Sequence, residues 1–190
     1  MSKNKTALVV GSSRGLGLAI AEELLRRDWN VIGTVREGTR TKLHDLAEKW
    51  TGRLTIRYLD MTFPAQIERL KSDLRGESLD LLFVNAGVAN DKGMHETIGE
   101  ISTEEFVRVM VTNALSPMRV LERLTENVRR GGVVGVMSNA VRPARADRGP
   151  AGDFIRPWPK AVRARGPLPP RPLARTLPLG RLENQIRVPD

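Results

Sequence analysis

The chain contains no cysteine, only two histidines and a single tyrosine, Tyr58, among its 190 residues. The lack of cysteine excludes a disulfide framework, a zinc–thiolate centre and a thiol nucleophile. His44 and His95 lack the spacing of metal ligands, so no metal is expected. No apolar run is long enough to cross a bilayer, and Met1–Lys5 carries no apolar signal region. We therefore expect a soluble cytoplasmic protein that does not bind membranes.

The net charge of +9 is unevenly distributed. Residues 1–140 hold 20 basic and 18 acidic side chains, whereas residues 141–190 hold 11 and 4, together with ten of the 12 prolines. Proline removes backbone donors and fixes φ, so neither a helix nor a central strand is expected in the second part. We predict a folded domain over 1–140 and a disordered Arg/Pro-rich basic tail over 141–190, with at most one turn of helix in 177–186.

Apolar runs and amphipathic segments alternate along the first part of the chain. The runs predict strands at 7–10, 31–35, 54–59, 79–84 and 132–137. The segments predict helices at 16–25, 42–50, 67–74 and 102–121. Strict alternation favours parallel pairing with right-handed crossovers. The prediction is an α/β fold, a Rossmann-type doubly wound parallel sheet that is truncated after its fifth strand.

The last predicted helix carries two local signals. Ser102-x-x-Glu105 has the form of a capping box, in which the Ser102 hydroxyl accepts from the Glu105 N–H and the Glu105 carboxylate reaches back. Pro117 lies inside the same helix and is expected to kink it.

A glycine-rich turn, Gly11-x-x-x-Gly15-x-Gly17, joins the first strand to the first helix. Gly11 permits a tight turn, and Gly15 lets the backbone approach a pyrophosphate. Gly17 lets the helix lie against the sheet, with its N-terminal N–H groups facing the anion. An ordinary strand–helix turn is the plainer alternative, but the placement between strand and helix favours nucleotide binding.

The turn resembles that of the short-chain dehydrogenase/reductase (SDR) family, whose pattern is Thr-Gly-x-x-x-Gly-x-Gly, with Val10 here in place of the threonine. The resemblance extends over residues 5–139. Further matches follow in the family's order: Asp60-Met61 after the third strand, Asn85-Ala86-Gly87 after the fourth, Asn113 in the long helix and Ser138 after the fifth strand.

The resemblance implies a role for each match. Ser138 and Asn113 would belong to the catalytic site, Asp60 would contact adenine, and Asn85-Ala86-Gly87 would shape the cofactor cleft. The implied cofactor-binding residues are Gly11, Ser13, Arg14, Gly15, Leu16, Gly17, Arg36, Asp60, Met61, Asn85, Ala86 and Gly87. Plainer alternatives also stand: Asp60 as a turn cap, the Asn-Ala-Gly segment as a sharp bend, Asn113 as a solvated helix residue and Ser138 as a loop hydroxyl.

Two arginines predict the choice of cofactor. An acidic residue commonly follows the second strand in NAD enzymes, where it binds the ribose 2′-hydroxyl, whereas arginine suits a 2′-phosphate. The second strand here ends in Thr34-Val35-Arg36, with no acid before Glu37, and Arg14 adds a second positive group. Because guanidinium matches phosphate in geometry and charge, we expect NADP(H) in preference to NAD(H), although two solvated surface arginines would give the same pattern.

The Tyr-x-x-x-Lys that the family uses for proton transfer is missing. No tyrosine follows Ser138, and Lys160, the only lysine after it, stands among prolines. A tail rich in Arg, Pro, Ala and Gly is what a GC-rich coding sequence yields in the wrong frame. We hypothesise that a frameshift near codons 139–142 replaced the C-terminal part; genuine divergence is the alternative.

Three functions remain open. The first is an SDR-like oxidoreductase that transfers hydride between NADP(H) and a carbonyl or alcohol substrate, impaired in this chain. The second is a non-catalytic NADP-binding protein. A nucleic-acid or other acidic partner held by the tail is disfavoured, because the tail has few aromatic side chains and its charge is diluted by prolines. An open edge at Val133, Val134 and Val136 would also favour a homo-oligomer or aggregation.

Overall fold

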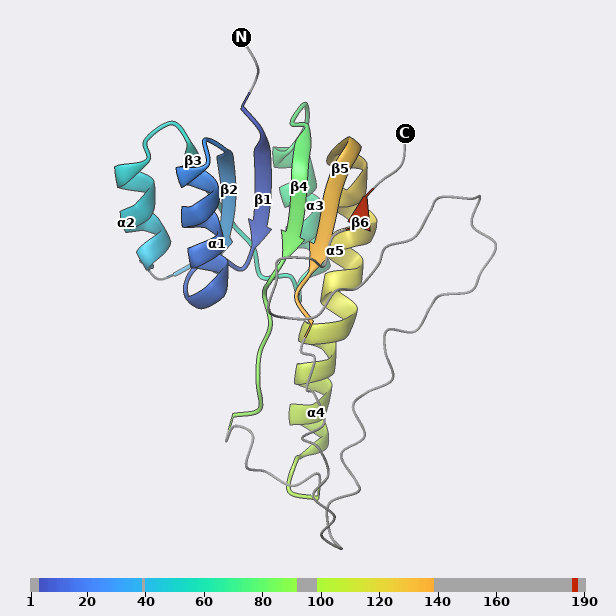
Figure 1. Ribbon diagram of the computed structural model, residues 1–190. Helices are drawn as coiled ribbons and strands as arrows, with labels where there is room; N and C mark the ends of the chain where they lie inside the picture. The colour runs from blue at the N-terminus through green and yellow to red at the C-terminus, as the bar shows by residue number, and fades with distance from the viewer. Residues whose placement is uncertain (1–3, 39, 92–98, 139–185, 188–190) are drawn as a thin grey trace, which may run out of the picture.

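The computed structural model describes residues 4–38, 40–91, 99–138 and 186–187. Six strands form one sheet in the order β3-β2-β1-β4-β5-β6, and neighbours among β1 to β5 pair in parallel (Figure 1). The order reverses beside β1, which lies between β2 and β4, and a crevice for a ligand is expected there. The strands are β1 (Thr6–Val10), β2 (Asn30–Val35), β3 (Leu54–Tyr58), β4 (Leu79–Val84), β5 (Val128–Val136) and β6 (Ile186–Arg187).

Helices cover both faces of the sheet, and each face has its own apolar core. Leu25 and Leu43, from α1 and α2, pack with β1, β2 and β3 on one face. Ile67 and Leu124, from α3 and α5, pack with β4 and β5 on the other. The helices are α1 (Gly15–Arg26), α2 (Lys42–Lys49), α3 (Pro64–Asp73), α4 (Thr103–Met110) and α5 (Ser116–Leu124), followed by the short 3₁₀ helix η3 (Thr125–Asn127). The doubly wound fold is therefore confirmed.

The long helix continues through Pro117 by changing its winding. Between α4 and α5 lies a π-helical segment, η2 (Val111–Leu115), in which the Ser116 N–H bonds the Val111 carbonyl. Proline has no N–H and its ring crowds the carbonyl four residues earlier, here that of Asn113. A wider π turn is one way in which a helix accommodates such crowding, and it lies directly before Pro117, where the sequence predicts a kink. In Figure 1, α4 projects beyond the carboxyl ends of the strands.

The predicted capping box is half correct. The Ser102 hydroxyl accepts from the Glu105 N–H at 3.1 Å. The Glu105 carboxylate, however, binds the Arg108 guanidinium and the Asp91 N–H, because these charged and loop partners lie on its side of α4.

The far edge of the sheet differs from the prediction. β5 begins four residues earlier than expected, and β6 pairs antiparallel with it at Val133 and Val134. The parallel part of the sheet ends at β5, as predicted, and the two-residue β6 (Ile186–Arg187) adds an antiparallel strand at the edge rather than a central strand. Val134 is buried rather than open. The predicted tail residues 141–185, including Lys160, lie outside the described residues. Within the described part of the chain, no helix has the length and apolarity needed to cross a membrane.

Candidate functional site

The glycine turn lies between β1 and α1 and is anchored on β2. The Gly11 N–H donates to the Thr34 hydroxyl at 2.9 Å, and the Ser12 N–H donates to the Thr34 carbonyl at 3.0 Å. Ser12 is fully buried, and its hydroxyl contacts the Val9 and Thr34 carbonyls. These bonds fix the path of the turn at the carboxyl end of the sheet.

The turn and the Asn-Ala-Gly segment after β4 are in direct contact. A Cβ on Gly11, which has φ +83°, would lie 2.6 Å from Ala86. The Asn85 side-chain amide donates to the Gly11 carbonyl at 2.9 Å. A Cβ on Gly17 would lie 2.1 Å from that same carbonyl oxygen. The two motifs, 74 residues apart, therefore form one close-packed unit.

The N-terminus of α1 is open to an anion. Arg14 is the N-cap residue and makes no side-chain capping bond, and the first turn contains no acidic residue. The first N–H groups of a helix lack intrahelical partners and carry partial positive charge. Gly15 has φ +58° and open space where a Cβ would stand. Such a terminus accommodates a phosphate group.

A hollow of about 520 Å³ lies beside the turn, at the ends of β2 and β3. Arg36 is exposed there and forms no ion pair among the described residues. Thr41 caps α2 in a capping box with His44, whose Nδ1 accepts from the Thr41 N–H at 3.0 Å. The lining residues are Ser13, Arg36, Glu37, Thr41, Asp60, Phe63 and Gln66.

Asp60 lines this hollow and also caps the turn before α3. Its Oδ1 accepts from the Thr62 N–H at 2.9 Å and the Thr62 hydroxyl at 2.6 Å, and its own N–H donates to Gln66 Oε1 at 2.7 Å. Met61 is 4% exposed and packs in the core, so only its backbone can face a ligand. The structure thus gives Asp60 the turn-capping geometry that was its plainer interpretation.

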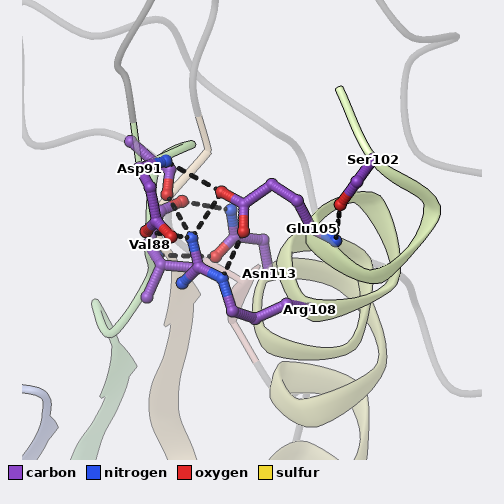
Figure 2. Close-up of polar contacts among 7 residues, drawn as sticks. Val88, Asp91, Ser102, Glu105, Arg108 and Asn113 are labelled. Carbon is purple, nitrogen blue, oxygen red and sulfur yellow. Dashed lines mark hydrogen bonds and ion pairs between the residues drawn. The ribbon is translucent and has the colours of Figure 1, made fainter. Parts of the chain in front are cut away.

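Asn113 and Ser138 lie at the β4–β5 side of the site. The Asn113 side chain binds the Val88 backbone twice: its Oδ1 accepts from the N–H at 2.8 Å, and its Nδ2 donates to the carbonyl at 2.7 Å (Figure 2). A Cβ on Gly87 would lie 3.2 Å from Asn113 Oδ1. Ser138 is exposed two residues beyond β5, and the preceding Met137 N–H binds the Val84 carbonyl. Asn113 is therefore tied to the loop after β4, not only solvated.

Tyr58 cannot replace the missing tyrosine. It lies on β3, which β2, β1 and β4 separate from β5. At roughly 4.8 Å per strand, that separation is about 19 Å. Among the residues that the structure describes, no group of three or more His, Cys, Asp or Glu side chains is arranged to hold a metal.

Sequence reasoning missed several residues of the hollow, namely Thr41, Phe63 and Gln66. Pro64 at the first helical position was the available signal, because it places the start of α3, and hence Phe63, at the carboxyl edge of the sheet. Nothing local in the sequence marks Thr41 or Gln66 as facing the same hollow.

Comparison with known proteins identifies the same family as the sequence motifs. The family model for short chain dehydrogenases matches residues 5–148. The 3-oxoacyl-[acyl-carrier-protein] reductase FabG of Salmonella typhimurium is 32% identical over 151 residues, which is 73% of this chain and 59% of the relative. The chain therefore spans about three fifths of the length of such curated relatives.

Solved structures of other proteins share the fold. A short-chain dehydrogenase/reductase from Burkholderia multivorans with bound NADP superposes with a TM-score of 0.72 at 50% identity, covering 77% of this chain and 64% of that one. A carbonyl reductase from Pseudomonas aeruginosa PAO1 in complex with NADP gives 0.68 at 33% identity, covering 73% and 60%.

Proposed function

The chain belongs to the short-chain dehydrogenase family, and from that premise we propose that it binds NADP(H) at the carboxyl ends of its strands. Residues 1–140 would form this cofactor-binding domain, and the described tail residues Ile186–Arg187 add β6 to the edge of its sheet. When bound, the cofactor supplies or accepts a hydride, here exchanged with a carbonyl or alcohol carbon. The uncapped N-terminus of α1, beside the open space at Gly15, is the observation that carries the proposal.

The described residues suit the parts of such a ligand. The N-terminus of α1, with Ser13 and Leu16, faces the position of a diphosphate, and Arg14 adds positive charge. Arg36, which has no ion-pair partner among the described residues, opens on the hollow that a 2′-phosphate and adenosine would enter. Phe63 is 57% exposed and offers its ring to a base. NADP-bound relatives add support.

NAD(H) is the competing cofactor, because Glu37 lines the same hollow. A carboxylate there would accept from a free ribose 2′-hydroxyl and repel a 2′-phosphate. Arg36→Ala separates the two alternatives. We expect it to weaken NADPH binding about tenfold, with NADH affinity changed less than twofold. Arg26→Ala, which removes an exposed α1 ion pair, is the matched control. Equal losses for both cofactors would remove the preference for NADP(H).

We further propose that the chain binds cofactor without turning over a carbonyl substrate. Ser138 and Asn113 would remain at the substrate side, where a serine hydroxyl can orient a carbonyl. No tyrosine follows Ser138 to transfer the proton, however, and loss of general acid–base catalysis costs about 10²- to 10⁴-fold.

Calorimetric titration with NADPH, followed by a ketone-reduction assay on the same preparation, tests both statements. Saturable binding with no turnover is expected. Absence of NADPH and NADH binding would contradict the cofactor proposal, and measurable reduction would contradict the proposal of inactivity.

A further inference from the structure

A cluster of side chains on the long helix holds the loop that follows Gly87 (Figure 2). Besides the two bonds from Asn113 to Val88, Arg108 Nη2 donates to the Ala89 carbonyl and to Asp91 Oδ1, each at 2.9 Å. The Asp91 N–H in turn donates to Glu105 Oε1 at 2.8 Å. Val88, Ala89 and Asp91 of the loop are therefore held by side chains of α4 and η2.

Arg108 is the centre of this cluster. Its Nε and Nη2 donate to the two Glu105 carboxylate oxygens at 2.7 and 2.6 Å, in the bidentate geometry that planar guanidinium permits. The Arg108 side chain is 39% exposed and that of Glu105 only 16%, so the pair is partly shielded from water. One side chain thus orients Glu105 for its bond to the loop and binds the loop directly.

The position of the loop of residues 88–91 determines which half of a bound dinucleotide it can contact. A dinucleotide with its phosphorylated ribose at Arg36 and its diphosphate on α1 runs from the end of β2, past β1, toward β4. Its nicotinamide half would then lie at the end of β4, beside Gly87 and Asn113. The adenine half would lie on the other side of the glycine turn, in the hollow at the ends of β2 and β3, whose lining includes none of residues 88–91.

We propose that Arg108 is a positioning residue for the nicotinamide half of the cofactor site, acting through the loop of residues 88–91. The inference rests on the proposed function, because it needs a bound dinucleotide. Without Arg108, the Glu105 carboxylate loses its fixed orientation and the Ala89 carbonyl loses its donor. The loop then samples positions away from the helix, and only the ligand half that meets it is held less well.

The affinities of two ligands distinguish a positioning role of Arg108 from a general contribution of Arg108 to folding. NADPH occupies both halves of the site, whereas 2′,5′-ADP carries the adenosine with its 2′- and 5′-phosphates and lacks the nicotinamide half. For Arg108→Ala we expect NADPH affinity to fall about tenfold and 2′,5′-ADP affinity to change less than twofold. Arg108→Lys keeps the charge without the planar fork, so it should restore little of the NADPH affinity. Arg123→Ala, which removes an exposed ion pair between Arg123 on α5 and Glu68 on α3, should leave both affinities unchanged.

Hydrogen exchange of the unliganded chain supplies a second readout. The Asp91 amide, which donates to Glu105, should exchange faster in Arg108→Ala than in the parent or in Arg123→Ala. Unchanged NADPH affinity in Arg108→Ala, or equal losses for both ligands, would overturn the inference. A parent chain that binds neither ligand would instead refute the proposed function itself, so the two failures are distinguishable.

Discussion

Gly17 has no room for a side chain, because its Cβ position lies 2.1 Å from the Gly11 carbonyl oxygen and 2.7 Å from the Asn85 amide nitrogen. Both neighbours belong to the unit that joins β1, α1 and the loop after β4. A methyl group there must separate α1 from the turn, which would also move the N–H groups that face the proposed diphosphate.

For Gly17→Ala we predict a loss of about 1–3 kcal/mol in the free energy of unfolding, as is typical of overpacking. Urea denaturation followed by circular dichroism measures it. Gly99→Ala is the control, because nothing lies within 4 Å of its Cβ position. Equal stability of the two variants would show that α1 does not pack this closely on the turn in solution.

The candidate site could be predicted only in part from the types and spacing of its residues. The glycine turn, Arg36 and the Asn-Ala-Gly segment could be named as candidates from the sequence, because their chemistry is local and their spacing is characteristic. The buried side chain of Met61 was not predicted, since its burial depends on how α3 packs against the sheet. Arg108 was missed because nothing near it in sequence indicates a loop 17 residues away.

At the scale of elements, the attachment of the loop of residues 88–91 to α4 depends on the charge state of Glu105. The hydrogen bond from Arg108 lowers the pKa of the Glu105 carboxyl below its ordinary value, and the Asp91 N–H acts in the same direction. A carboxyl with a lowered folded-state pKa stabilises the folded state above its unfolded-state pKa, and that stabilisation disappears as pH falls through the folded value.

We therefore predict that the loop of residues 88–91 loosens in acid, below the ordinary pKa range of glutamic acid. Amide exchange of Asp91, corrected for intrinsic pH dependence, should accelerate there. Glu105→Gln should remove this pH dependence while leaving the remainder of the acid transition in place. A corrected exchange rate that stays flat down to the global acid transition would contradict the role of Glu105.

Elements set by local periodicity were predicted well, and those set by distant contacts were not. The five parallel strands and the helices over both faces follow from apolar spacing. The π-helical η2 lies directly before Pro117, and the sequence indicated an irregularity of the long helix there but not its π winding. β6 is a pairing between residues about 50 positions apart, and no local pattern marks Ile186–Arg187 as a strand.

At the scale of the whole molecule, apolar side chains gather on the long helix that projects from the sheet. Phe106 is 45% exposed, Val107 50%, Leu115 41% and Met118 65%. Exposed apolar side chains on one projecting helix favour self-association.

We predict that the full chain elutes as an oligomer or aggregate in size-exclusion chromatography with light scattering. The double variant Val107→Lys, Met118→Lys should shift the population toward monomer. Tyr58→Lys, which removes an equally exposed side chain on β3, should not. A parent chain that is already a monodisperse monomer would rule out this surface as a cause of association.

Residues 141–190 carry a prediction about the gene. If a frameshift near codons 139–142 produced the Arg/Pro-rich tail, one of the other two reading frames downstream encodes Tyr-x-x-x-Lys a dozen or so codons after Ser138. Sequencing this region from the source DNA and translating it in all three frames tests the prediction. Absence of the motif from both frames would leave the tail as a genuine divergence.

The glycine turn of residues 11–17 is proposed to bind the diphosphate of a nicotinamide cofactor, and every other functional proposal depends on that contact. Hydrogen exchange with mass spectrometry, with and without NADPH, measures it most directly. We predict slower exchange in peptides covering residues 11–18 and the neighbourhood of Arg36, and no such change in Gly17→Ala at the same NADPH concentration. If saturating NADPH leaves the exchange of residues 11–18 unchanged, the proposed contact between the glycine turn and the diphosphate is contradicted.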